Sequence, residues 1–365
     1  AEPLLARVEG LLQLHEREVL IHPEPLQEFG HSDVRRPLQF VGQGIVGHHV
    51  DDIPSLRALA DADPLVSGLV AVADDVTVAL VGGVVRDALL DRAPTTDVDV
   101  VVEGPAIPVA RRLAERTGAA LTTHDRFGTA VVRMGDGRHL DLVTARRETY
   151  AHPGALPTVT PGTLADDLAR RDFTVNAMAY TLDGPSPNTV VDPHGGRDDL
   201  ARRRIRILHD ASFVDDPSRL LRAVRYAARL GFTLDPGTER AARAAAPHLT
   251  LESARVTEEL RRLLEEDSAG AALELARDLG VPWIAPGGDL GDRVSVLAAA
   301  VAHPHAPSVA LWAVRLGVAV RPDERRRAPL DASARSDADG VDAADALVAA
   351  LGSGGHRGSD VDRIL

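Results

Sequence analysis

The sequence predicts a mixed α/β domain followed by an all-helical half. Three observations favour this fold class. β-branched runs alternate with helical stretches between residues 71 and 200, apolar positions recur every three or four residues after residue 215, and 365 residues suffice for two or three domains. Hydrophobic residues make up 44% and charged residues 26% of the chain, which is typical of an ordered protein with a buried core.

The α/β pattern begins with a β-branched strand at Val76–Val81, after which Gly82 and Gly83 open a helix that runs to Leu90. A second strand, a helix and three short strands follow. These are the strand Val98–Val102, the helix Ile107–Thr117, and the strands Ala119–Thr123, Thr129–Met134 and His139–Thr144. The domain is expected to end near residue 200.

Residues 1–70 form an extension to which we assign no role. A helix is expected from Leu4 to Leu20, and the remainder of the extension is expected to be irregular. Its scattered histidines lack the helical spacing of a metal site, so we interpret them as ordinary surface or core residues.

Composition excludes several classes of function. The chain has no cysteine, which rules out disulfides and thiolate catalysis and allows a cytoplasmic location, the one we expect. No uninterrupted apolar run reaches the ~18 residues that a bilayer requires, and no signal peptide is evident, so we expect no membrane segment. The net charge of −13 argues weakly against a nucleic-acid partner, but arginines gather in clusters that could bind phosphates.

Acidic residues stand on two of the predicted strands. Asp97 and Asp99 begin the second strand, where residues i and i+2 point to one face about 6.5 Å apart and can share a ligand. Asp141 interrupts an apolar strand that could lie beside it. Carboxylate oxygens favour Mg²⁺ or Mn²⁺ over zinc. Taken alone, the acids also fit a solvated strand end.

Two glycines precede these acids. Gly82 and Gly83 join a strand to a helix, a connection that lets backbone N–H groups approach a phosphate, and Arg86 lies one turn into that helix. A tight turn would explain the glycines, but not why the acid pair begins the very next strand. Phosphate and magnesium sites commonly occur together, so the two features favour a common site.

Five motifs in order extend this pattern from about residue 78 to about residue 282. They are Val81–Asp87, Asp97–Asp99, Arg170–Ala179, Asp192–Leu200 and Asp215–Ala223. Together they resemble the class II tRNA nucleotidyltransferase and bacterial poly(A) polymerase family, a branch of the DNA polymerase β superfamily. The resemblance implies a polymerase β-like nucleotidyltransferase head at 71–200, a helical neck at 201–270, and a helical body and tail at 271–365.

The resemblance also implies the chemistry. Such an enzyme adds C, A or both to tRNA 3′ ends from CTP and ATP, without a template, and releases pyrophosphate. Asp97 and Asp99 would hold two Mg²⁺ ions, with Mn²⁺ also possible, and Asp141 matches the third catalytic carboxylate.

Further residues are implied to bind the nucleotide. They are Gly82, Gly83, Arg86, Arg171, Asp172 and Asn176. The glycines and Arg86 would cradle the triphosphate, and Asp172 would accept the ribose 2′-hydroxyl, which selects ribonucleotides. Helix capping is the alternative role of Asp172 and Asn176.

Asp216 and Arg219 are i and i+3 on a predicted helix and therefore share a face. Cytosine and adenine each present an amino donor beside a ring-nitrogen acceptor, which a carboxylate and a guanidinium can match. The pair is thus a candidate protein template for CTP and ATP, although an ordinary ion pair has the same spacing. Asp215 replaces the glutamate of many family members, so its role in orienting the neighbouring arginine is open.

Arg222 and Arg225 continue this helix and could follow the acceptor stem of tRNA through phosphate contacts. We expect no obligate protein partner.

The nearest alternative function is a poly(A) polymerase acting on general RNA. A dinucleotide-binding dehydrogenase built on Gly82 and Gly83 is disfavoured because these glycines are not part of a Gly-x-Gly-x-x-Gly motif and because the acids follow too soon for a ribose-binding residue about 20 positions on. A non-catalytic RNA sensor is disfavoured because the three acids are retained.

Overall fold

The computed structural model describes residues 53–74, 76–92, 97–149 and 158–285, together with residues 294, 315, 319 and 320. The chain divides into two compact units, Ala1–Gly44 and Ile45–Leu365, and every described residue lies in the second. The helix expected at Leu4–Leu20 and most of the expected body and tail therefore lie outside the described residues. In the part of the chain that is described, no helix combines the length and the apolar character needed to cross a membrane.

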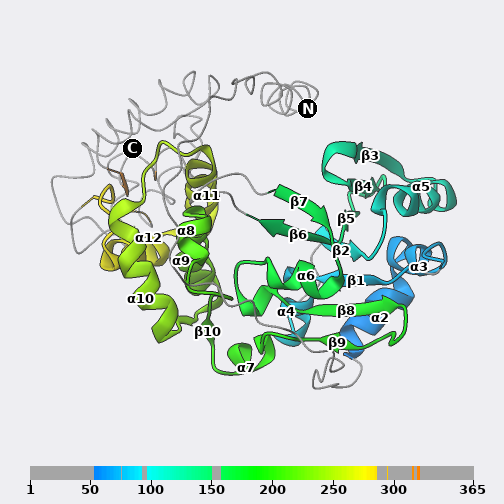
Figure 1. The fold of residues 1–365 in the computed structure, drawn as a ribbon, viewed down its shortest axis with the longest axis horizontal. Helices are drawn as coiled ribbons and strands as arrows, with labels where there is room; N and C mark the ends of the chain where they lie inside the picture. The colour runs from blue at the N-terminus through cyan, green and yellow to red at the C-terminus, as the bar shows by residue number, and fades with distance from the viewer. Residues whose placement is uncertain are drawn as a thin grey trace, which may run out of the picture. The chain divides into compact units, whose positions relative to one another are not determined.

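A seven-stranded sheet forms the centre of the head, in the order β3-β4-β5-β2-β1-β8-β9 (Figure 1). Its strands are β1 (Val78–Val81), β2 (Asp97–Val102), β3 (Ala120–His124), β4 (Thr129–Arg133), β5 (His139–Thr144), β8 (Ala179–Asp183) and β9 (Val190–Val191). β2 and β5 run parallel, and the other neighbouring pairs of this sheet are antiparallel. The mixed sheet expected from the sequence is confirmed.

Strand alternation separates the two faces of this sheet. Val98 and Val100 of β2 and their partners Leu140 and Leu142 of β5 are buried in the main core. Helix α5 (Ala106–Thr117) packs over β3, β4 and β5 on this side. Since successive side chains of a strand point to opposite faces, the acidic residues between these apolar positions belong to the other face.

A second, smaller core lies on that other face. Helix α6 (Leu164–Ala169) contributes Leu164 and Leu168, which pack with Val81 and Val101. The helix contacts both β2 and the two-stranded ribbon of β6 (Arg146–Thr149) and β7 (Thr158–Pro161), as Figure 1 shows. The acidic face of the sheet is thus covered in part by α6, and the sequence analysis does not predict this ribbon.

Two helices precede the sheet where the sequence analysis expects irregular chain. Helices α2 (Pro54–Ala62) and α3 (Pro64–Val70) each begin with proline, and the Asp63 carboxylate caps α3 by accepting N–H bonds from Leu65 and Val66. Proline is favourable at the first helical position and aspartate at the N-cap, so the local signals for both helices are present in the sequence. Leu56, Leu65 and Leu69 are buried in the main core, so the packed head begins before residue 71.

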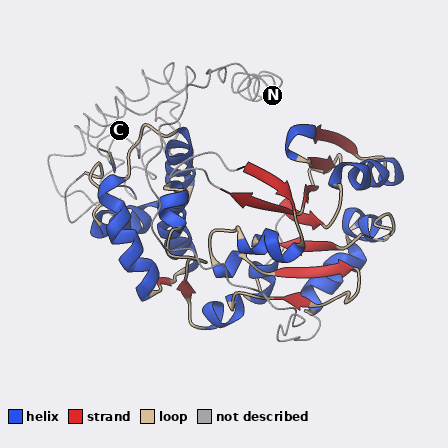
Figure 2. Ribbon diagram, in the orientation of Figure 1, coloured by secondary structure: helices blue, strands red, loops and turns tan. Residues whose placement is uncertain are grey.

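The remaining short elements lie within the head or between the head and the neck. They are α4 (Gly83–Leu89), η1 (Asp125–Phe127), η2 (Thr174–Asn176), α7 (Gly196–Ala201) and the parallel pair β10 (Arg204–Ile205) and β11 (Thr233–Leu234). Of these elements, α7 and β10 lie between the sheet and the helical part in Figure 1 and Figure 2.

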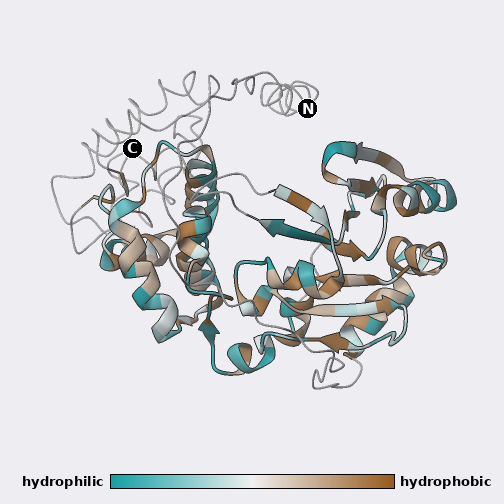
Figure 3. Cartoon of the chain, in the orientation of Figure 1, coloured by the Kyte–Doolittle hydropathy of each residue, from teal (hydrophilic) through white to brown (hydrophobic). Residues whose placement is uncertain are grey.

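The neck is helical as expected. Its helices are α8 (Ser212–Asp215), α9 (Ser218–Leu230), α10 (Pro236–Ala245), η3 (Ala246–His248) and α11 (Ala254–Glu265), and α12 (Ala269–Leu279) begins the expected body. Leu220, Leu221 and Val224 lie on the buried face of α9, which packs against α11 and α12. In Figure 3 these helices carry both hydrophilic and hydrophobic segments, as helices with one buried face do.

Candidate active site

The acidic residues of two strands meet on the face of the sheet that α6 partly covers. β2 and β5 are in a parallel register that sets Asp99 directly beside Asp141, on strands that lie ~4.8 Å apart. Asp97 occupies the first position of β2, two residues before Asp99, and its register partner is His139. The Asp99 side chain is exposed and Asp141 is half-buried. The structure therefore brings together the acids that the sequence places on separate strands.

The donor chemistry of this face fits a hard divalent cation. Asp99 and Asp141 offer carboxylate oxygens, which Mg²⁺ and Mn²⁺ prefer. Within the described residues, no three His, Cys, Asp or Glu side chains already converge as a metal-binding cluster. The fit rests on the oxygen donors and on the register that makes them neighbours.

Gly82 borders the acidic face at the turn between β1 and α4. Its φ of +71° and ψ of −126° are rarely adopted by residues with a side chain. A Cβ atom at Gly82 would lie 3.0 Å from Nη1 of Arg171 and 3.6 Å from Oδ2 of Asp99. The missing side chain thus allows the Arg171 guanidinium and the Asp99 carboxylate to share this corner, and Gly83 follows as the first residue of α4.

Arg86 is buried rather than open to a ligand. Its Nε and Nη2 donate to the two carboxylate oxygens of Asp87 at 2.9 and 2.8 Å, and its Nη1 donates to Oδ1 of Asn176 at 2.7 Å. The guanidinium also lies 5.4 Å from the ring centroid of Tyr226. Arg86 is therefore buried and bonded to Asp87 and Asn176, and this geometry does not favour the expected direct contact with a triphosphate.

A second arginine network surrounds Asp167, whose side chain is 0% exposed. Oδ1 of Asp167 accepts from Nε and Nη2 of Arg170 at 2.9 and 2.6 Å, and Oδ2 accepts from Nη2 of Arg171 at 3.0 Å. Arg170 also donates to Glu148 of β6 at 3.1 Å. The sequence analysis does not single out Asp167, although its spacing of three and four residues from the two arginines is the signal that could have identified it.

Asp172 is buried and ionised. Its Oδ1 accepts from Phe173 N at 2.8 Å and Asn176 Nδ2 at 3.2 Å, and its Oδ2 pairs with Nη2 of Arg222 at 2.7 Å. Burial alone would raise the pKa of this carboxyl, but Arg222, the Asn176 amide and Arg219 outweigh burial and hold the pKa below its usual value. The predicted ribose acceptor is therefore a carboxylate tied to a neck helix.

Asp216 differs from the sequence-based expectation. It is the extended residue between α8 and α9 and not part of a helix, so the expected i, i+3 geometry with Arg219 within one helix is wrong. The reason is local: Pro217 disfavours helical backbone at the residue before it, and the Asp216 carboxylate instead accepts from the N–H of Ser218 at 3.1 Å, near the start of α9. Its other oxygen pairs with Arg255 at 3.2 Å.

Arg219 connects the neck to the head. Nη1 donates to Oγ of Ser212 at 3.0 Å, and Nη2 donates to the carbonyl of Arg170 at 2.9 Å. Asp215 ends α8, where its Oδ2 lies 3.9 Å from Nε2 of His209. Burial, followed by Arg219, lowers the pKa of His209 against the opposing effect of Asp215.

Arg225 is not part of an exposed phosphate-binding stripe. The side chain is buried in the neck, where Nε donates to Glu259 at 2.6 Å and Nη1 donates to Glu266 at 2.8 Å. Its guanidinium lies 4.7 Å from the ring centroid of Tyr226. The helix turns this position toward α11 and not toward solvent, so the expectation of an exposed arginine at this position is wrong, whereas the contact between Arg225 and RNA stays a prediction.

The Asp192–Leu200 motif supports the nucleotide motif structurally. Asp192 accepts from the N–H groups of Gly196 and Arg197 and so caps α7. Asp199, which is buried, accepts from Oγ1 of Thr174 at 2.7 Å and from Nε of Arg206 at 2.7 Å. The motif thus stabilises the turn that carries Asp172 and Asn176, through the contact between Asp199 and Thr174.

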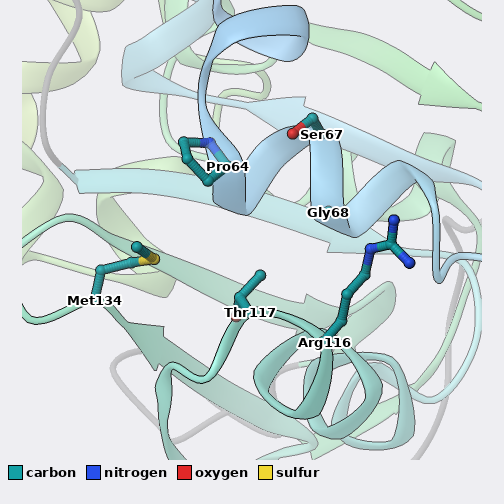
Figure 4. Close-up of a pocket in the computed structure, with 6 residues that line it drawn as sticks. All are labelled: Pro64, Ser67, Gly68, Arg116, Thr117 and Met134. Carbon is teal, nitrogen blue, oxygen red and sulfur yellow. The ribbon is translucent and has the colours of Figure 1, made fainter.

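A cavity of about 380 Å³ lies between α3 and α5, near the end of β4 (Figure 4). The lining residues are Pro64, Ser67, Gly68, Arg116, Thr117 and Met134. None of the site residues described above lines it, so this cavity is distinct from the acidic face.

Two family models match the chain. Residues 78–206 match a poly A polymerase head domain, and residues 231–282 match a probable RNA and SrmB-binding site of polymerase A. The first match covers the sheet with its acidic face, and the second covers the helices α10, α11 and α12 but not α8 or α9.

Curated relatives extend these matches. A CC-adding tRNA nucleotidyltransferase of Deinococcus radiodurans is 41% identical over 261 residues, which cover 68% of this chain and 69% of the relative. A-adding tRNA nucleotidyltransferases of Aquifex aeolicus and Halalkalibacterium halodurans are 46% and 42% identical over 54% and 55% of this chain. The chain spans only 24% and 48% of the lengths of these two A-adding relatives.

Solved structures with the same fold include a tRNA nucleotidyltransferase complexed with a primer tRNA and an incoming ATP analogue. It is 35% identical, with a TM-score of 0.56, over 67% of this chain and 71% of that one. An apo CCA-adding enzyme is 29% identical, with a TM-score of 0.68, over 82% of this chain and 75% of that one. From its motifs, its fold and these matches, the chain belongs to the family of class II tRNA nucleotidyltransferases and bacterial poly(A) polymerases.

Proposed function

We propose that this chain carries the catalytic part of an RNA nucleotidyltransferase that adds C, A or both to tRNA 3′ ends from CTP and ATP. The observation that carries the proposal is the register of Asp99 beside Asp141, next to the corner shared by Gly82 and Arg171. In this arrangement, carboxylates that could bind cations lie beside a guanidinium that could bind a phosphate. Transfer of a nucleotidyl group needs both, because charge must be neutralised on the triphosphate and on the attacking hydroxyl.

Asp97 and Asp99 would hold the divalent cations, two Mg²⁺ or Mn²⁺ ions in all, with Asp141 as the third carboxylate. When bound, such ions neutralise the triphosphate and favour the deprotonated form of the RNA 3′-hydroxyl. Asp141 would accept the proton that this hydroxyl loses. The RNA oxygen then forms the bond to the α-phosphorus, and the bond to the pyrophosphate oxygen breaks.

The nucleotide would lie between the acidic face and the neck. Arg171 would donate to the phosphates, and Gly82 and Gly83 would allow the triphosphate to approach the backbone. Asp172 would accept the ribose 2′-hydroxyl, because a carboxylate can accept about four hydrogen bonds and Asp172 retains capacity beyond its contacts to Phe173, Asn176 and Arg222.

Asn176 and Arg86 would together orient Asp172, the proposed acceptor of the ribose hydroxyl. Asn176 donates to Asp172 and accepts from Arg86, so Arg86 fixes which edge of the amide faces Asp172. We therefore propose that Arg86 orients Asn176 and does not itself grip the triphosphate.

Asp216 and Arg219 would match the amino group and ring nitrogen of cytosine or adenine. The support is that Arg219 reaches the carbonyl of Arg170, which begins the nucleotide motif, and that Asp216 lies at the adjoining break between α8 and α9. Arg255 competes for the Asp216 carboxylate, so base recognition would require sharing or displacement of that ion pair.

The RNA partner would be a tRNA acceptor stem and its 3′ end, with no obligate protein partner, and we propose a cytoplasmic location. The support is that two similar proteins, a tRNA nucleotidyltransferase and the CCA-adding enzyme of Thermotoga maritima, have been solved in complexes with tRNA. One alternative is a poly(A) polymerase acting on general RNA, favoured by the match to a poly A polymerase head domain. The Tyr150–Val159 stretch, which resembles the loop of A-adding and poly(A) members, lies mostly outside the described residues.

The test supplies the full chain with Mg²⁺, each NTP separately, and tRNAs that end before, within and one residue short of CCA. Growth by C and A that stops at CCA, CC or a single A supports tRNA 3′-end synthesis and identifies its type. Long A tracts on unrelated RNA would favour the poly(A) alternative. Absence of incorporation with every tRNA and every NTP would contradict the proposal.

A further inference from the structure

Asp167 is a buried carboxylate that the proposed reaction does not use directly. It lies on α6, is fully shielded from solvent, and divides its two oxygens between two guanidinium groups. Oδ1 accepts twice from Arg170, and Oδ2 accepts from Nη2 and Nε of Arg171 at 3.0 and 3.3 Å. A buried charge of this kind is stable only when it is paired, and Oδ2 pairs with Arg171 whether or not Oδ1 pairs with Arg170.

The two arginines have different surroundings. Arg170 has a second carboxylate partner, Glu148 on β6, at 3.1 Å. Arg171 extends instead toward the acidic face, where its Nη1 donates to the carbonyl of Asn176 at 3.4 Å and lies over Gly82. The Asp167 contact therefore matters most for the arginine that borders the site.

The position of Arg171 depends on a balance between two carboxylates. Its Nη1 and Oδ2 of Asp99 lie 3.0 and 3.6 Å from the same point, the Cβ position that Gly82 lacks. Without Asp167, Coulomb attraction would draw the guanidinium toward Asp99 and compete with a cation there. With Asp167 in place, Nε and Nη2 of Arg171 are engaged by that carboxylate, and Nη1 at the Gly82 corner has a second N–H beyond its contact with the Asn176 carbonyl, which a phosphate could accept.

We infer that Asp167 is the positioning residue of this site: it holds Arg171 for the triphosphate of the incoming nucleotide and prevents it from pairing with Asp99. The inference rests on the proposed function, because it assumes that the anion beside Arg171 is a nucleoside triphosphate. It implies that loss of Asp167 weakens nucleotide binding and raises the Mg²⁺ concentration needed for activity, while tRNA binding is retained.

The experiment compares the full chain with Asp167→Asn, Arg171→Gln and the double variant. The control is Asp166→Asn, the same substitution at the adjacent residue of α6, where the carboxylate is part of an N-terminal capping box and pairs with the exposed Arg147. For each protein we measure the Kd for CTP and ATP by equilibrium dialysis, KM and kcat for addition to tRNA, the Mg²⁺ concentration at half-maximal rate, and Tm.

Asp167→Asn is expected to raise the nucleotide KM and Kd about tenfold, the usual effect of losing a charge-assisted contact, with tRNA affinity within about twofold. The double variant should be no worse than Arg171→Gln alone, since both changes act on one guanidinium. Asp166→Asn should lower Tm and leave KM unchanged. If Asp167→Asn does not fold, Arg170→Gln replaces it, and this variant should leave KM within about twofold.

Two results would overturn the inference. One is an Asp167→Asn variant that loses Tm as the control does, with unchanged nucleotide KM and Mg²⁺ requirement. The other is a double variant whose losses multiply, or an Arg170→Gln variant whose KM rises tenfold. Failure of the proposed function has a different signature: the unsubstituted chain itself would bind neither CTP nor ATP.

Discussion

At the residue scale, the site depends on backbone and charge arrangements that bring unlike groups close together. Gly82 removes a side chain where the Arg171 guanidinium and the Asp99 carboxylate meet. Asp172 is kept ionised in a buried position by Arg222 and by hydrogen bonds to the charged form. Single substitutions at these positions should therefore change the binding and addition of nucleotides more than they change the fold.

Gly82→Ala is expected to lose most nucleotide addition. The new Cβ would lie 3.0 Å from Arg171, and a positive φ costs a residue with a side chain of the order of 1–3 kcal/mol. Gly118→Ala is the control, because Gly118 also has a positive φ but no atom within 4 Å of its Cβ position. Both variants should unfold at lower urea concentration, and only Gly82→Ala should raise the nucleotide KM. Equal kinetic losses in both would contradict the steric role of Gly82.

At the element scale, much of the fold follows from local patterns. β5 matches the strand predicted at His139–Thr144, and β2 and β4 differ from their predictions by one residue. Alternation also predicts that Asp99 and Asp141 lie outside the apolar core. The parallel register of β2 and β5 is a long-range property, however, and no local pattern could fix Asp99 opposite Asp141.

Helix α9 of the neck is a second case in which a local pattern predicts the element but not its long-range contacts. Its heptad-like spacing predicts a helix, but not which arginines point inward, because that depends on α11 and on the head. Arg225 faces Glu259 and Glu266, and Arg222 faces Asp172. The break at Asp216, by contrast, was predictable from Pro217, because a proline disfavours helical backbone at the residue before it.

Arg225→Ala should destabilise the neck. Removal of one partner from a buried ion pair costs about 3–5 kcal/mol, since Glu259 would be left buried without its guanidinium. The control is Arg229→Ala on the same helix, whose side chain is 41% exposed and 3.7 Å from Glu266, and which should change stability by less than about 1 kcal/mol. Urea unfolding measures both. A stable Arg225→Ala variant with weakened tRNA binding would restore the RNA-contact hypothesis.

Arg222→Gln should loosen the contact between α9 and the nucleotide motif, with a loss of about 2 kcal/mol in the free energy of unfolding at pH 7. Because the folded-state pKa of Asp172 lies below its usual value, the ion pair stabilises the fold above the ordinary aspartate pKa of ~3.9. This contribution disappears as the pH falls through the folded-state pKa. The stability difference between the two proteins should therefore be constant from pH 7 to about pH 5 and shrink in more acidic solution; a difference that persists unchanged at pH 3 would contradict the assignment.

At the scale of the whole molecule, the chain combines a nucleotidyltransferase head with a helical neck, and ion pairs and hydrogen bonds from Arg219 and Arg222 link the two. The family follows from ordered motifs spread over both parts, which is why it was predictable from the sequence. The number and identity of the added nucleotides do not follow from these motifs, since A-adding, CC-adding and CCA-adding relatives all match this chain.

The central claim is that the carboxylates of β2 and β5 form one metal-dependent site for nucleotide addition. The most direct measurement is the rate of nucleotide incorporation into tRNA by the unsubstituted chain, Asp99→Asn and Asp141→Asn, with tRNA affinity measured in parallel. The account predicts Mg²⁺-dependent incorporation that falls at least ~100-fold in each variant, while the Kd for tRNA changes less than about twofold. Unchanged turnover in either variant would contradict it.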